Sequence, residues 1–118
     1  MALALLADPE DVPFLPVEAE VYWVRTMILW SADKKPTRPV VVIEAPPTSL
    51  GRVLVVTRTT DVKRRGVPHD AMPEIGLSRC GVFADFGSAE ATLWTRRNAR
   101  RLGILPASVF RQVLERFG

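Results

Sequence analysis

Two valine-rich stretches decide the fold: Thr37–Ile43, with the sequence TRPVVVI, and Arg52–Thr57, with the sequence RVLVVT. Each contains a run of consecutive apolar residues that is short for a helix and rich in β-branched side chains, which indicates a strand. A strand that is apolar at successive positions is covered on both faces, so we expect both stretches to lie centrally in a sheet. Pro39 lacks an N–H group and is expected only at the first residue of its strand. The segment Pro46–Gly51 breaks the chain between the two strands.

Working outward, the sequence predicts further strands and one helix. Residues 20–30 (EVYWVRTMILW) are β-branched and aromatic and favour a strand, followed by a polar turn over residues 31–37. Strands are also expected at residues 81–86 and 91–94. An edge strand near residue 75 is expected within the proline-containing, irregular stretch 67–80.

Residues 107–117 predict an amphipathic helix at the end of the chain. Its apolar side chains fall on one face, and Pro106 suits its first turn, with Gly118 at its end. Four or five short strands closed by one helix predict a mainly β fold with α, built as a small barrel-like sheet. The apolar face of the helix consists of Val109, Phe110, Val113, Leu114 and Phe117.

The length of 118 residues fits one domain, which we place at residues 18–118. Residues 1–17 hold three prolines and predict an N-terminal extension that lies across the domain or is partly mobile. The apolar start, Met1–Leu6, is short, lacks a basic flank and does not resemble a signal peptide, and no apolar run reaches membrane-helix length. Cys80 is the only cysteine, which excludes an intramolecular disulfide, and we expect it to be a small buried residue. These features favour the cytoplasm and predict no cofactor and no metal.

Charge is distributed unevenly along the chain. Residues 1–50 hold four Lys/Arg and seven Asp/Glu, a net charge of −3, whereas residues 51–118 hold twelve and six, a net charge of +6. The second half is therefore the better candidate for contact with an anionic partner such as nucleic acid. The alternative is that these arginines only solubilise the surfaces of strands and the helix.

The two decisive strands also carry a family pattern. Thr37–Ile43, a loop and then Val53–Thr57 resemble the MazF/PemK family of toxin endoribonucleases, and Val21-Tyr22-Trp23 matches the Val-Tyr-aromatic step of that family's first strand. The resemblance covers roughly residues 18–118. It implies a small SH3-like curved antiparallel sheet closed by a C-terminal helix, usually in a homodimer. It also implies metal-independent, sequence-specific cleavage of single-stranded RNA, and an acidic antitoxin protein as partner.

In that family the arginine before the proline and the threonine that closes the next strand carry the site, which implies Arg38 and Thr57 as catalytic residues. A guanidinium binds two phosphate oxygens and stays charged, and Pro39 favours extended backbone at Arg38. His69, the only histidine, is a candidate acid or base, although a solvated loop histidine is the alternative. Candidate RNA contacts are Arg58, Lys63, Arg64, Arg65, Arg96 and Arg97 for phosphates and Trp30 for a base.

Two other functions share the same expected core. One is a non-catalytic toxin of this fold that traps a protein target, as the related CcdB-type toxins trap DNA gyrase. Those toxins depend on a C-terminal Trp-Gly-Ile ending, whereas this chain ends in Arg116-Phe117-Gly118. The other is an interaction module without activity.

Overall fold

Strands β2 (Thr37–Glu44) and β3 (Arg52–Thr59) form the centre of the sheet, as their continuous apolar sequence predicts. They pair antiparallel, with Val40 opposite Thr57 and Val42 opposite Val55. Successive side chains of β2 alternate between the two faces of the sheet, and Val40, Val41 and Val42 are all fully buried. Both faces of these strands are therefore covered.

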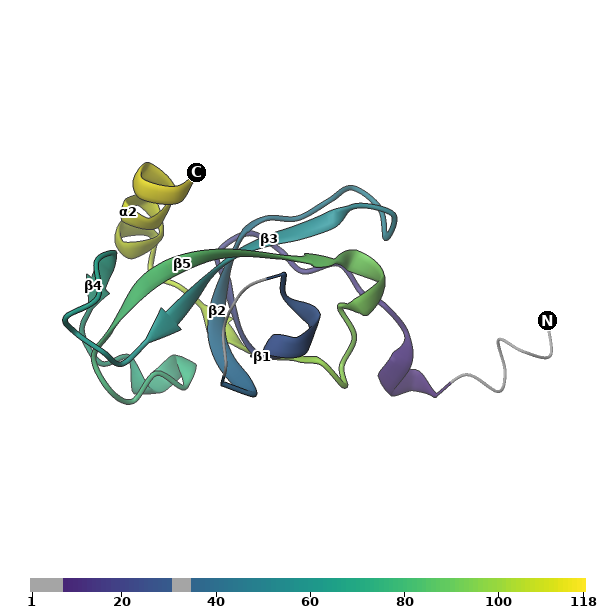
Figure 1. Ribbon diagram of the computed structural model, residues 1–118, viewed down its shortest axis with the longest axis horizontal. Helices are drawn as coiled ribbons and strands as arrows, with labels where there is room; N and C mark the ends of the chain where they lie inside the picture. The colour runs from purple at the N-terminus through teal and green to yellow at the C-terminus, as the bar shows by residue number, and fades with distance from the viewer. Residues whose placement is uncertain (1–7, 31–34) are drawn as a thin grey trace.

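The computed structural model describes residues 8–30 and 35–118, whose six strands form one antiparallel sheet ordered β4-β5-β3-β2-β1-β6. Figure 1 shows the sheet curled, with α2 beside β4 at one end of the molecule. The predicted mainly β, barrel-like fold with a C-terminal helix is confirmed. The remaining elements are β1 (Glu20–Arg25), β4 (Val67–His69), β5 (Gly81–Glu90), β6 (Ala99–Ile104) and α2 (Ala107–Phe117).

The two faces of the sheet support separate hydrophobic cores. On the first, which we name the Trp94 face, Trp94 and Tyr22 pack with Val40, and the two rings meet edge to face with 5.1 Å between centroids. On the second, the helix face, Val113 of α2 packs with Val41. The predicted helix is confirmed, although only Val113 on its apolar face is fully buried. Val109, Phe110 and Phe117 are half-buried and Leu114 is exposed.

Several predicted strand limits are wrong, because tertiary pairing and turns override local propensity. The first strand ends at Arg25 and continues as the 3-10 turn η2 (Thr26–Ile28), which lets Leu29 bridge to Ala89. Residues 91–93 form a 3-10 turn, η4, instead of a strand. The edge strand lies at residues 67–69 instead of near residue 75, because the 3-10 turn η3 occupies Pro73–Ile75. The sequence did not predict β6.

Strands β3 and β5 are longer than predicted because they pair with each other along their whole lengths, from Arg52 opposite Glu90 to Thr59 opposite Val82. Pro39 is the third residue of β2 instead of the first, and it is accommodated because the pairing of β2 with β3 begins only at Val40. Glu20 at the start of β1 accepts hydrogen bonds from the Tyr22 hydroxyl at 3.0 Å and the Val17 amide at 2.6 Å, and also pairs with Arg101.

Residues 8–17, which we name the strap, lie against residues 94–97, the segment that leads into β6. Pro13 bridges to Thr95, and the Phe14 amide donates to the Trp94 carbonyl at 3.0 Å. The strap includes the 3-10 turn η1 (Pro9–Asp11). The interpretations of Met1–Leu6 and of the turn at residues 31–34 lie outside the described residues. No helix in the described part of the chain has the length and apolar character needed to span a membrane.

Candidate active site

Arg38 and the threonines of β3 come together on the Trp94 face at one end of the central strands. Val40 lies opposite Thr57, and Arg38, two residues earlier on β2, points to the same face as Val40. Diagonal neighbours on adjacent strands lie roughly 7–8 Å apart, which is within reach of a long side chain. The structure thus places Arg38 and Thr57 on neighbouring strands and on one face.

Thr57 does not close its strand, because β3 continues to Thr59. The Thr57 hydroxyl donates to the Asp85 carbonyl at 3.3 Å, and the residue is 5 % exposed. Thr59 shares the same face, and its hydroxyl accepts a hydrogen bond from the Asp61 amide at 3.1 Å. This acceptor role leaves the Thr59 hydroxyl proton available for donation. Because side chains alternate along β3, Thr59 is a further candidate for the site. The sequence analysis did not single it out, because the strand was expected to end at Thr57.

An acidic side chain lies next to these hydroxyls. Asp85 of β5 pairs directly with Thr57 and so shares its face, and its carboxylate is exposed. Arg64, from the loop between β3 and β4, donates to both carboxylate oxygens of Asp85 at 2.6 and 2.7 Å. This two-point contact fixes the orientation of the carboxylate and joins the basic loop to the β3–β5 pair. Asp85 was not predicted, because no motif in the sequence indicates which carboxylate lies opposite Thr57.

The predicted basic loop borders a cavity. Lys63, Arg64 and Arg65 are all exposed. Arg64 and Arg65 line a cavity of about 390 Å³ together with Arg116 from α2. Three guanidinium groups around one hollow favour an anionic ligand. Lys63 is not among the residues that line this cavity.

Arg58 is placed differently from the other candidate arginines. It is 8 % exposed, its Nε donates to His69 Nε2 at 3.2 Å, and its Nη2 donates to the Arg79 carbonyl at 2.5 Å. Burial, and next the charge of Arg79, lower the pKa of Arg58. These partners occupy a side chain that has little access to solvent, which favours a structural role over contact with RNA.

His69 belongs to the same buried network. Its Nδ1 lies 2.7 Å from the Asp70 carbonyl oxygen and must donate to it, so the neutral ring accepts the Arg58 hydrogen bond at Nε2. Burial lowers the pKa of His69, and the nearby Arg58 charge lowers it further, while the Asp70 hydrogen bond opposes them. Both ring nitrogens therefore have protein partners, which disfavours proton transfer to a substrate.

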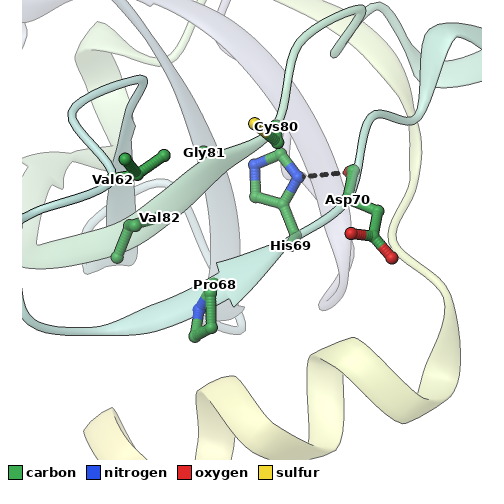
Figure 2. Close-up of a pocket in the computed structure, with 7 residues that line it drawn as sticks. All are labelled: Val62, Pro68, His69, Asp70, Cys80, Gly81 and Val82. Atoms are coloured by element: carbon green, nitrogen blue, oxygen red, sulfur yellow. Dashed lines mark hydrogen bonds between the residues drawn. The ribbon is translucent and has the colours of Figure 1, made fainter.

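His69 lines a cavity of about 310 Å³ together with Pro68, Asp70 and Cys80. Figure 2 shows the side chains of the lining residues. The imidazole ring stands between the Asp70 backbone, to which it is hydrogen-bonded, and the segment that carries Cys80 and Gly81. Cys80 is exposed, so the expectation of a buried cysteine is wrong. Cys80 is the last residue of the predicted irregular stretch and lies just before β5, where no strand pairing draws it into a core.

The remaining predicted RNA contacts lie elsewhere. Trp30 is 84 % exposed, and its amide donates to the Ser88 carbonyl at 2.8 Å, which holds it beside β5. Arg96 and Arg97 line a hollow at the start of β6 with Trp23. Among the residues that the structure describes, no group of three or more His, Cys, Asp or Glu side chains is placed to hold a metal ion.

The described fold is similar to that of solved MazF and MazE–MazF structures. Chains in two crystal forms of MazE–MazF from Deinococcus radiodurans share 18 % identity with this chain, with TM-scores of 0.62 and 0.61. Both matches cover 89 % of this chain, and they cover 93 % and 94 % of the two matched chains. MazF from the same organism gives a TM-score of 0.66 at 18 % identity, over 89 % of this chain and 94 % of that one. No family model and no curated protein sequence matches this chain. The chain has a MazF-like fold.

Proposed function

We propose that this chain is the toxin of a toxin–antitoxin pair and acts as a sequence-specific endoribonuclease on single-stranded RNA, without a metal. One observation carries the proposal: a MazF-like fold places Arg38 and the hydroxyls of Thr57 and Thr59 on one face of adjacent strands. The paired Arg64 and Asp85 border the same place. We further propose a homodimer, located in the cytoplasm and held inactive by an acidic antitoxin, since MazE–MazF structures have this fold.

The chemistry requires little from the protein besides charge and positioning. RNA carries its own nucleophile: the 2′-oxygen attacks the adjacent phosphorus, the bond from phosphorus to the 5′-oxygen breaks, and a 2′,3′-cyclic phosphate remains. Arg38 binds two phosphate oxygens and stabilises the charge that develops on them, and a threonine hydroxyl donates to one of them. Asp85 accepts the proton of the 2′-hydroxyl, and the leaving 5′-oxygen takes a proton from solvent.

The test is cleavage of a long mixed-sequence RNA by the purified chain in EDTA. We expect cleavage at short motifs that leaves 2′,3′-cyclic phosphate ends, and a loss of about 100- to 1,000-fold in rate for Arg38→Ala. Thr57→Val and Thr59→Val remove one hydroxyl each at nearly constant shape and identify which one contributes. Arg111→Ala, an exposed arginine of α2, is the matched control and should cleave normally.

The outcomes separate the function classes. Cleavage that persists in Arg38→Ala would contradict the proposed site. If no RNA is cut but expression arrests growth, the chain instead traps a protein target. If neither effect occurs, it is an interaction module.

A further inference from the structure

A second basic hollow lies on the opposite face of the sheet from Arg38. It measures about 270 Å³ and is lined by Trp23, Arg25, Thr37, Arg96, Arg97 and Arg100, and we name it the Trp23 groove. The register places Trp23 beside Arg100 and Arg25 beside Thr37, all on the helix face, whereas Val24 pairs with Arg38 on the Trp94 face. Thr37 and Arg38 thus stand on opposite faces at the same end of β2.

The residues that line the groove carry positive charge and no negative charge of their own. The groove has four arginines and no carboxylate among its lining residues. Arg97 pairs with the strap, through Nε to Asp11 at 2.7 Å and Nη2 to Asp8 at 3.0 Å. Within residues 8–30 and 35–118, no carboxylate is close enough to Arg25, Arg96 or Arg100 to form an ion pair. Such a cluster of like charges favours an anionic ligand.

The aromatic side chain in the groove narrows the class of ligand. Trp23 is 39 % exposed, although its neighbours on β1, Tyr22 and Val24, are buried. An exposed indole among guanidinium groups is the combination that binds single-stranded nucleic acid, because bases stack on the ring while arginines contact the phosphates. An acidic peptide would use the arginines but would not need the indole.

We propose that the Trp23 groove binds single-stranded RNA, as a second segment of the strand that is cut on the Trp94 face. This inference rests on the proposed ribonuclease function. Because Thr37 and Arg38 are consecutive residues at one strand end, an RNA strand that passes around this end contacts both faces. The groove adds affinity for a flanking segment and makes no contact with the scissile phosphate.

The test measures binding of a labelled, uncleavable 2′-O-methyl RNA of twelve mixed-sequence nucleotides to the full chain by fluorescence anisotropy. Arg25→Gln with Arg100→Gln should weaken binding at least tenfold and lower the slope of log affinity against log salt by about 1.4, from two lost phosphate contacts. Trp23→Ala should weaken binding about 5- to 100-fold, and Trp23→Phe should retain most of the affinity. The matched control, Arg79→Gln with Arg111→Gln, makes the same charge change at exposed positions outside the groove.

Cleavage kinetics with ordinary RNA complete the test. We expect the groove variants to raise KM while kcat is unchanged, because the groove holds substrate and transition state equally. If the wild type cleaves RNA and the groove variants bind the probe and cleave as it does, the inference is wrong while the proposed function stands. If the wild type neither binds nor cleaves RNA, the proposed function fails as well. A poly-glutamate peptide tests the other class of ligand. If the peptide binds the wild type and binds the groove variants more weakly, while the RNA affinity of these variants is unchanged, the inference is wrong and the groove serves an acidic protein partner.

Discussion

The buried pair of Arg58 and His69 makes the stability of this chain depend on pH near neutrality. Arg58 donates to His69 Nε2 at 3.2 Å, so a proton at that nitrogen would abolish the hydrogen bond and place two cations in contact. The folded state lowers the pKa of His69 below its ordinary value, chiefly through burial. The unfolded chain therefore takes up a proton at a higher pH than the folded chain does, and stability decreases as pH falls below about 6.5.

The hydrogen bond sets the size of the effect. A hydrogen bond to a charged group contributes about 1.5–3 kcal/mol, and we take the lower value because the adjacent cavity admits solvent that screens the charges. For a domain of this size, about 1.5 kcal/mol corresponds to a fall of about 6 °C in Tm between pH 7.5 and pH 5.

Thermal unfolding followed by circular dichroism at half-unit steps of pH measures this fall. His69→Gln keeps an acceptor for Arg58 and a donor for the Asp70 carbonyl but does not titrate, so its Tm should be nearly constant over the same range. Equal falls in Tm for the wild type and His69→Gln would refute the argument, since another group would then be responsible.

Three further predictions concern the start of β1, the helix and the strap. Burial raises the pKa of the Glu20 carboxyl, but hydrogen bonds from Arg101, the Val17 amide and Tyr22 outweigh it and hold the pKa below its usual value. Glu20 therefore stabilises the fold above about pH 4.5 and this contribution disappears at lower pH, so Glu20→Gln should flatten the acid limb of a Tm profile between pH 5 and pH 3. Val113→Ala, at a fully buried site, should lower the free energy of unfolding in urea by about 2 kcal/mol. Phe110→Ala should lower it by about the same amount despite the larger side chain, because Phe110 is only half-buried. A loss above about 4 kcal/mol for Phe110→Ala would show that the helix packs more deeply on the sheet. Asp8→Asn with Asp11→Asn should release Arg97 and strengthen binding of the uncleavable RNA probe at least threefold, whereas unchanged affinity would show that the strap does not compete with RNA.

The core strands could be predicted because their sequence leaves few alternatives. Val40–Ile43 and Val53–Val56 are apolar at every position, and a central strand covered on both faces accounts for this without further information. The amphipathic period of residues 107–117 likewise identifies the helix. The strand β6 was less predictable, because its sequence is polar and basic and it becomes a strand only through its pairing with β1.

The site could be predicted only where one residue restricts another. Pro39 restrains Arg38, and an apolar β2 beside an apolar β3 brings Arg38 near the threonines. Asp85 and Arg58 needed the structure, since their roles follow from partners 28 and 11 positions away in sequence, Thr57 and His69. Nothing in the local sequence separates the buried Arg58 from the exposed Arg64.

Strand alternation also explains how one short sequence supplies two basic surfaces. On β1 the residues Tyr22 and Val24 face the Trp94 core, so Trp23 and Arg25 between them must face the other way, beyond the part of the helix face that α2 covers. The end of β2 repeats this division, with Arg38 on one face and Thr37 on the other. The groove residues offer phosphate contacts and a stacking surface, which add affinity without selecting a sequence. The proposed RNA-binding groove therefore lies apart from the proposed site at Arg38, on the opposite face of the same strands.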